Sequence, residues 1–285
     1  MSSLLERQKK WDTVALNFSR NCLKPKDRAP IKWDTFSMRL TLTDRTASGL
    51  CGQWAVSALD FSFAMPLGIY IQVPFCQTKC TYCNFHTGVV SSDRHRPYAE
   101  AVCREIAKAG ESPHATVDTV YVGGGTPSLL DPAHLAKIMD TLRASFRMGL
   151  LEVTLEADPE TITPQKASAW AGAGFNRISL GSQSFDDREL KAAGRMHRRT
   201  DIFSALESLR TAGIGNISMD LIAGLPHQTP ESWEKSVGEL LAVRPEHVSV
   251  YMLEIDEGSR LGRESLAGGS RYSARAIPDL SLIHI

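Results

Sequence analysis

Several features that define common protein classes are missing from this 285-residue sequence. It contains no run of the ~20 apolar residues that a membrane-spanning helix needs, so we expect no stable insertion into a membrane. It has no excess of positive charge, since 32 Lys and Arg balance 32 Asp and Glu. This balance predicts no extended basic face, and we expect no nucleic-acid partner. The first ten residues lack the apolar core of a secretory signal, and we expect a cytoplasmic protein.

A second Cys-x-x-Cys pair is missing as well. The chain has six cysteines, and three of them, Cys76, Cys80 and Cys83, fall within eight residues. A structural zinc site usually takes two separated pairs of ligands, and a disulfide framework takes cysteines spread along the chain. The clustering therefore predicts a metal site in a reducing compartment.

The spacing Cys-x3-Cys-x2-Cys lets one loop place three thiolates around a single four-iron cluster. Such a cluster normally takes four cysteines, one for each iron, so three cysteines leave one iron open to a ligand. Three other interpretations stay open at this point: a zinc site completed by His86, a disulfide, and buried free thiols. The spacing favours the cluster.

From residue 67 onward, short apolar runs rich in Val, Ile and Tyr alternate with segments of helical period. This alternation is typical of α/β folds with a parallel sheet. Six units are too few for a closed eight-stranded barrel, and we expect a partial (β/α)6 barrel with its chemistry at the carboxyl ends of the strands. The predicted strands are 68–73, 117–122, 152–155, 177–180, 217–222 and 247–253, and the predicted helices are 97–109, 132–146, 164–171, 187–193, 200–212 and 231–241.

Both ends of the chain lack this pattern. Residues 1–64 show no sustained period, and we expect a non-native or disordered extension ahead of Met65. Residues 65–262 form the predicted core barrel. Residues 263–285 offer neither a helix face nor a capped strand and are expected to be an irregular, artefactual tail.

Five segments together resemble the radical SAM (S-adenosylmethionine) superfamily, and within it the oxygen-independent coproporphyrinogen III oxidases (dehydrogenases) and the HemW heme chaperones. The resemblance covers about residues 67–262, and the segments occur in the family's order. They are Gly68-Ile-Tyr-Ile-Gln-Val-Pro-Phe-Cys76, Gly123-Gly-Gly-Thr-Pro127, Glu156-Ala-Asp-Pro159, Ser179-Leu-Gly-Ser-Gln-Ser-Phe185 and Asp220-Leu-Ile-Ala-Gly-Leu-Pro226.

The resemblance implies that Cys76, Cys80 and Cys83 hold a [4Fe-4S] cluster whose open iron binds SAM. Tyr70 and Tyr82 would flank the cluster and the SAM. The methionine end of SAM would be lined by Gly124, Gly125 and Thr126; glycines after a strand permit close backbone approach, although an ordinary tight turn would explain them too.

Glu156 would contact the same cofactor. Gln183 and Asp220 suit the ribose hydroxyls, because an amide oxygen and a carboxylate accept hydrogen bonds. Arg195 would pair with the SAM carboxylate through its two-pronged guanidinium. For each charged residue, a solvated rim or a barrel salt bridge is the alternative.

The implied chemistry is one-electron cleavage of SAM to methionine and a 5′-deoxyadenosyl radical, with a reduced flavodoxin- or ferredoxin-type protein as electron donor. The true dehydrogenases carry a further cysteine where this chain has Phe85, which favours the chaperone branch. The family's usual histidine is replaced by Gln72.

We therefore expect a C-terminally truncated HemW-like heme chaperone, which binds heme and passes it to haemoproteins. The heme motif of that branch, His-Asn-x-x-Tyr-Trp, is missing from the sequence, so no heme ligand is named. The first alternative is an oxidoreductase that converts the propionates of coproporphyrinogen III to vinyl groups. The second is a non-catalytic heme- or metal-binding module.

Overall fold

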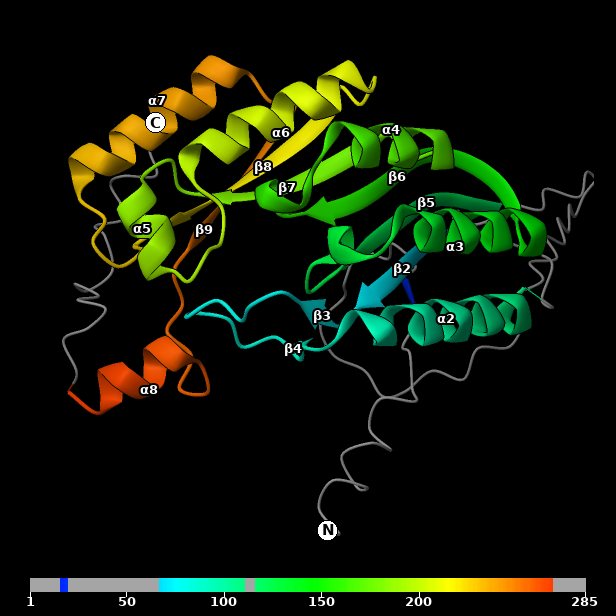
Figure 1. The fold of residues 1–285 in the computed structure, drawn as a ribbon, viewed down its shortest axis with the longest axis horizontal. Coiled ribbons are helices and arrows are strands. Elements are labelled where there is room, and N and C mark those ends of the chain that lie inside the picture. Colours follow the sequence, from blue (N-terminus) through cyan, green and yellow to red (C-terminus); the bar gives the residue numbers. More distant parts are fainter. Residues whose placement is uncertain (1–15, 20–66, 111–115, 269–285) are drawn as a thin grey trace, which may run out of the picture. The chain divides into compact units, whose positions relative to one another are not determined.

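The computed structural model of the chain describes residues 16–19, 67–110 and 116–268 (Figure 1). Strands and helices alternate along nearly all of this part, as expected. The strands are β1 (Leu16–Ser19), β2 (Leu67–Val73), β3 (Phe75–Cys76), β4 (Gly88–Val89), β5 (Thr116–Gly124), β6 (Arg147–Ala157), β7 (Arg177–Gln183), β8 (Asn216–Ala223) and β9 (His247–Met252). The helices are α2 (His95–Ala109), α3 (Pro132–Ser145), α4 (Pro164–Ala173), α5 (Asp187–Ala192), α6 (Arg199–Thr211), α7 (Pro230–Val243) and α8 (Arg260–Leu266).

One seven-stranded sheet carries the fold, in the order β1-β2-β5-β6-β7-β8-β9. β1 runs antiparallel to β2, whereas all neighbours from β2 to β9 run parallel. Six parallel strands joined through helices confirm the predicted partial (β/α)6 barrel. β6 begins five residues before the expected position 152, because an irregularity after Val117 lets Arg147 and Met148 pair with the start of β5.

Side chains of alternating character divide the sheet into two faces. In β8, Ile217, Met219 and Leu221 are fully buried on the face covered by helices. The intervening Ser218 and Asp220 point to the other face, which is the inside of the partial barrel. Figure 1 shows the helices along the outside of the curved sheet, and α2, α3, α4 and α6 pack in sequence as neighbours. The polar face is therefore free to form a site.

The ends of several helices are capped by residue types that favour those positions. The side chains of Asp131, Thr163 and Thr229 accept hydrogen bonds from the first-turn N–H groups of α3, α4 and α7, each ahead of a proline. Gly174 and Gly213 follow α4 and α6 with φ angles of 96° and 85°, in the left-handed region that favours glycine. These caps fix where each loop leaves its helix.

Helix α8 is not predicted by the sequence pattern. It begins after Ser259, whose hydroxyl accepts a hydrogen bond from the Gly262 N–H at 2.9 Å, and it continues to Leu266. The domain boundary expected between residues 262 and 263 therefore falls inside a helix. Residues 269–285 lie outside the described part of the chain, as do residues 1–64 apart from β1, so the expectations for both ends stay predictions.

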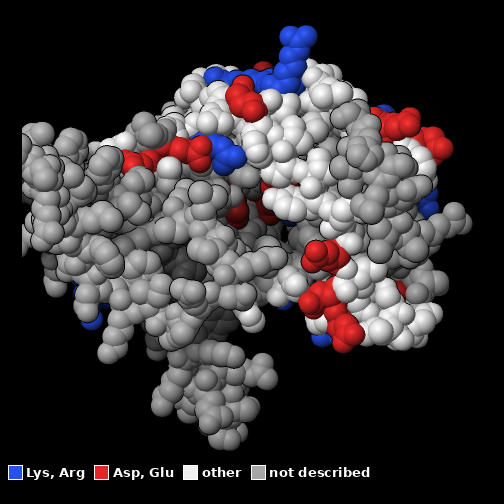
Figure 2. Space-filling model, turned by 180° about the vertical axis from the view of Figure 1, so that it is seen from behind, with Lys and Arg blue, Asp and Glu red and all other residues white. Residues whose placement is uncertain are grey.

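Two properties of the described residues concern membrane insertion and surface charge. None of their helices is both long and apolar enough to cross a membrane. On the face shown in Figure 2, their acidic and basic side chains form small separate groups, with no continuous basic surface.

The central strand β6 makes the core sensitive to loss of volume. Leu155 in this strand is fully buried, whereas Leu241 on α7 is 62% exposed. We predict that Leu155→Ala lowers the free energy of unfolding by about 2–5 kcal/mol, because the substitution removes buried surface and leaves a cavity. Leu241→Ala should change it by less than about 0.5 kcal/mol. Urea unfolding of both variants measures the difference, and equal losses would contradict the assigned core.

Candidate functional site

A pocket of about 360 Å³ opens at the carboxyl ends of the parallel strands. Eleven of the twelve residues expected at the site line it, and Tyr70 is the exception. Loops that follow neighbouring parallel strands meet at one edge of the sheet, which explains the agreement. The eleven are Cys76, Cys80, Tyr82, Cys83, Gly124, Gly125, Thr126, Glu156, Gln183, Arg195 and Asp220.

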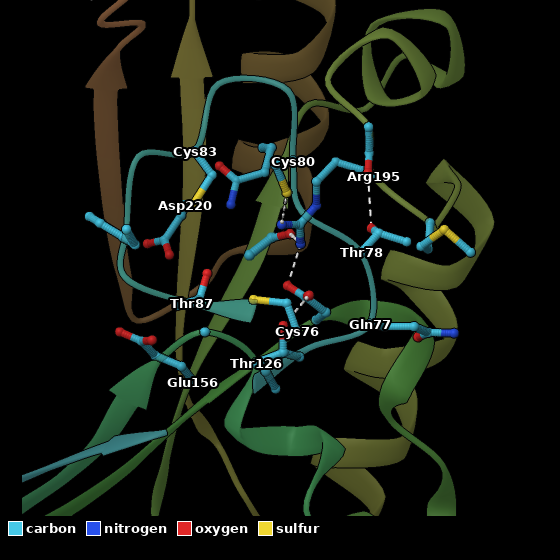
Figure 3. Close-up of a pocket in the computed structure, with 18 of the residues that line it drawn as sticks. Cys76, Gln77, Thr78, Cys80, Cys83, Thr87, Thr126, Glu156, Arg195 and Asp220 are labelled. Atoms are coloured by element: carbon cyan, nitrogen blue, oxygen red, sulfur yellow. Dashed lines mark hydrogen bonds and ion pairs between the residues drawn. The ribbon is translucent and has the colours of Figure 1, made fainter. Parts of the chain in front are cut away.

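The three cysteines come from one segment, which we call the cluster loop (residues 76–87). Cys76 ends β3, and the Cys83 N–H donates to the Cys80 carbonyl at 3.3 Å in the turn that follows. All three are free thiols that are half-buried and line the same cavity (Figure 3). The disulfide alternative is therefore not found.

The zinc alternative lacks a ligand set. His86 is exposed and does not line the pocket. In the part of the chain that the structure describes, no group of three His, Cys, Asp or Glu side chains could hold a single metal ion. A four-iron cluster is larger than one ion and binds each cysteine at a different iron, so its thiols need not converge on one point. The donor set fits the cluster better than zinc.

The glycine turn after β5 docks against the cluster loop. The N–H groups of Gly125 and Thr126 donate to the carbonyls of Val73 and Phe75 at 2.7 and 2.6 Å. The Gly124 N–H donates to the Glu156 carboxylate at 2.8 Å. All three N–H groups that follow the strand are thus used within the protein. The predicted contact of residues 124–126 with SAM therefore rests on their carbonyls, Cα atoms and side chains.

Glu156 ends β6 and lies beside two aromatic residues. Its carboxylate accepts hydrogen bonds from the Tyr121 hydroxyl and the Gly124 N–H, both at 2.8 Å. Burial nevertheless raises the pKa of Glu156 above its ordinary value of 4.5. Tyr70 stacks on Tyr121 with 5.7 Å between ring centroids, and burial with the nearby Glu156 charge raises the pKa of Tyr70 to about 12. Tyr70 therefore does not line the pocket itself. It stacks on Tyr121, whose hydroxyl donates to Glu156 in the pocket wall.

Two further strand ends present polar side chains to the pocket. Asp220 of β8 accepts a 3.5 Å hydrogen bond from Ser179, while its Oδ1 atom is buried with no partner. Burial raises the pKa of Asp220. Gln183 has a φ angle of 64°, and across it the Ser184 N–H donates to the Ser182 carbonyl at 2.8 Å. This strained γ-turn is a feature found at ligand sites.

Arg195 lines the pocket and forms a salt bridge, which is the alternative that the sequence left open for each charged residue. Its guanidinium forms an ion pair with Asp158 and donates to the Gly181 carbonyl at 2.8 Å. Asp158 and Glu160 line the pocket but were not predicted as site residues. The alternation along β6 could have identified Asp158, because it follows Glu156 by two positions and so lies on the same face of an extended chain.

Comparison with known proteins agrees with this geometry. The family model described as the radical SAM superfamily matches residues 70–240, which is more than half of the chain. This chain belongs to the radical SAM superfamily. The five segments that carry the resemblance extend over 68–226 and overlap nearly all of the matched range.

Curated radical SAM relatives include heme chaperones. The chain is 39% identical over 204 residues to "Heme chaperone HemW" of Synechocystis, covering 68% of this chain and 49% of the relative. It is 37% identical over 193 residues to the Bacillus subtilis protein of that name, covering 66% and 50%. The chain therefore spans about half the length of these relatives.

A solved radical SAM enzyme is similar in structure. Coproporphyrinogen III oxidase (HemN) from Escherichia coli superposes with a TM-score of 0.67 at 27% identity, covering 75% of this chain and 48% of that one. The match supports the partial barrel.

The close approach of the glycine turn to the cluster loop gives a stability prediction. A Cβ atom at Gly125 would lie 2.4 Å from the Phe75 carbonyl oxygen and 3.0 Å from Cys76 Sγ. We predict that Gly125→Ala lowers the free energy of unfolding by about 1–3 kcal/mol, because backbone must shift to make room.

Gly172 in α4 provides the matched control, since no heavy atom lies within 4 Å of its added Cβ. Gly172→Ala should raise stability by up to about 1 kcal/mol through helix propensity. Chemical unfolding followed by circular dichroism measures both variants. A Gly125→Ala protein as stable as the parent would show that the turn does not dock as described.

Proposed function

We propose that this chain is the radical SAM core of a HemW-type heme chaperone, and that its pocket binds a [4Fe-4S] cluster and SAM. The observation that carries the proposal is the set of three free thiols, Cys76, Cys80 and Cys83, which one loop presents to one pocket. Three thiolates leave one iron of the cluster without a protein ligand. When bound, the cluster would supply the electron that cleaves SAM.

The wall around the cysteines suits SAM. SAM carries two cationic groups, an ammonium and a sulfonium, and two ribose hydroxyls. The unpartnered Oδ1 of Asp220 can accept a hydrogen bond from a hydroxyl, and the buried carboxylate of Glu156 favours a nearby cation. Gln183 lines the same wall. These side chains orient the ligand and replace the water that it loses on binding.

The heme assignment rests on the relatives and on the mouth of the pocket. Relatives 37–39% identical to this chain are named heme chaperones. Phe85, Met196 and Tyr251 line the pocket and are exposed by 64%, 52% and 55%. Exposed apolar side chains around a pocket are typical of a binding surface for a large apolar ligand, such as heme or a porphyrinogen.

The partners follow from this chemistry. The cluster needs an external electron, for which we propose a reduced flavodoxin- or ferredoxin-type donor, and the chaperone would pass heme to acceptor haemoproteins. We propose a cytoplasmic location, where free thiols persist. The dehydrogenases carry a further cysteine at the position of Phe85, and its replacement favours the chaperone. Oxidation of coproporphyrinogen III is therefore kept as the alternative activity.

Cluster binding predicts a specific iron content. Anaerobic reconstitution of the wild-type chain should give about four irons per chain and a reduced-state electron paramagnetic resonance (EPR) signal that changes with SAM. Cys80→Ala should lose most of this iron, because it removes one ligand. Cys103→Ala should keep it, since Cys103 is buried in α2 and does not line the pocket. An iron-free protein that binds zinc tightly would contradict the proposal.

Heme binding at the mouth predicts a Soret absorption change when hemin is added. Replacement of both Phe85 and Tyr251 by Ala should weaken hemin binding about tenfold, because two aromatic contacts are lost. Leu241→Ala removes an equally exposed apolar side chain that does not line the pocket, and should leave binding unchanged.

Two results would favour the alternatives. SAM-dependent conversion of coproporphyrinogen III without hemin binding would identify a dehydrogenase. Hemin binding without SAM cleavage under reducing conditions would identify a non-catalytic binding module.

A further inference from the structure

The guanidinium of Arg195 contacts a cysteine of the cluster loop. Its Nη1 atom donates to Cys80 Sγ at 3.6 Å, as the dashed line in Figure 3 shows. The Arg195 side chain is only 8% exposed, so water screens this contact weakly. Among the residues that the structure describes, no Lys or Arg side chain makes a similar hydrogen bond to Cys76 or Cys83. Of the three proposed ligands, Cys80 is therefore the one that accepts a hydrogen bond from a described cationic side chain.

Asp158 holds the guanidinium in this position. One carboxylate oxygen forms the ion pair with Arg195, and the other accepts a 3.1 Å hydrogen bond from the Thr126 hydroxyl. The same terminal nitrogen of Arg195, Nη2, that pairs with Asp158 also donates to the Gly181 carbonyl. A Cβ at Gly181 would lie 3.1 Å from both Arg195 Nη2 and Asp158 Oδ1, so little free space remains around the pair. The arginine is fixed by contacts from three strand ends.

These contacts bear on the role that the family resemblance implies for Arg195. Both terminal nitrogens of Arg195 already have protein acceptors, namely the Asp158 carboxylate, the Gly181 carbonyl and Cys80 Sγ. Arginine stays protonated in proteins, so the guanidinium is a cation in this position. Its Nε atom is buried without a partner. The side chain is thus a cation held beside one thiol, and its terminal nitrogens cannot move onto an incoming carboxylate without breaking the ion pair with Asp158.

Hydrogen bonds to cluster sulfurs and nearby charges set the reduction potential of an iron–sulfur cluster. A cation beside a ligand sulfur stabilises the reduced cluster, because reduction adds one negative charge. We propose that Arg195 donates a charge-assisted N–H···S hydrogen bond to Cys80 that raises the reduction potential of the bound cluster, and that Asp158 is the positioning residue for this bond. The inference rests on the proposed function, which supplies the cluster.

The test is a redox titration of the reconstituted chain without SAM, followed by EPR. Arg195→Gln removes the cation and should shift the midpoint potential to more negative values than the wild type. Asp158→Asn removes the anchor together with a negative charge, so a negative shift in this variant shows that loss of the positioned hydrogen bond outweighs loss of the carboxylate. Arg188→Gln is the matched control. Arg188 is exposed on the neighbouring helix α5 and does not line the pocket, so its variant should keep the wild-type potential.

SAM binding separates this role from the one implied by the resemblance. If Arg195→Gln lowers the affinity for SAM but leaves the potential of the SAM-free cluster unchanged, Arg195 serves the SAM carboxylate and the proposal is wrong. Arg195→Lys keeps the charge without the planar fork and provides a milder variant should Arg195→Gln fold poorly.

The remaining outcomes are also decisive. If the wild-type chain takes up no cluster, the proposed function itself fails. If the wild type takes up the cluster but Arg195→Gln, Arg195→Lys and Asp158→Asn all do not, Arg195 is needed for assembly and the tuning role is overturned.

Discussion

The position of the cluster loop depends on one buried residue, Thr81, which is hydrogen-bonded on both sides. Its N–H donates to the Ala193 carbonyl at 2.9 Å, and its carbonyl accepts from the Leu261 N–H at 2.8 Å. Thr81 is only 2% exposed, and its hydroxyl donates to the Ala192 carbonyl at 3.2 Å. The residue lies between Cys80 and the turn that carries Cys83, so the end of α5 and the start of α8 together fix two of the three thiols. Segments more than 100 residues apart in the chain therefore build a loop that looks local in the sequence.

Much of the site could be predicted because parallel strands impose a simple geometry. Each motif that follows a strand reaches the same edge of the sheet, which is why eleven of twelve expected residues line one pocket. Side chains alternate between the two faces of a strand, so the sequence also predicts which strand residues point into the pocket. Ser179, Gly181 and Gln183 line the pocket in alternation along β7, while Ile178 and Leu180, which directly precede the first two, are fully buried on the other face. The same rule applied to β6 selects Asp158 once Glu156 is chosen.

Other features depend on contacts that no local pattern encodes. Helix α8 has seven residues and no sustained apolar period, and its start is fixed by the long-range bond from Leu261 to Thr81. Gly262 within it cannot carry a side chain, because an added Cβ would lie 2.0 Å from the Asp256 carbonyl oxygen. The contacts of Arg195 also depend on residues that are distant in the sequence. The sequence shows an arginine in a loop crowded with arginines, and only the folded chain brings Asp158 and Cys80 to it.

The charges of the pocket are arranged for a ligand that is cationic in part. At one end, Arg195 is ion-paired with Asp158 and donates to Cys80, so both charged side chains already have partners in the protein. At the other, burial raises the pKa of both Glu156 and Asp220, because their charged forms lose hydration that the protein does not fully replace. A cationic group bound between these carboxylates would compensate the lost hydration and lower both pKa values again. A bound anion would instead add like charge beside two carboxylates whose charged forms are already poorly solvated. The acidic wall therefore favours a ligand that brings a cationic group to this end of the pocket, as the proposed ligand SAM does.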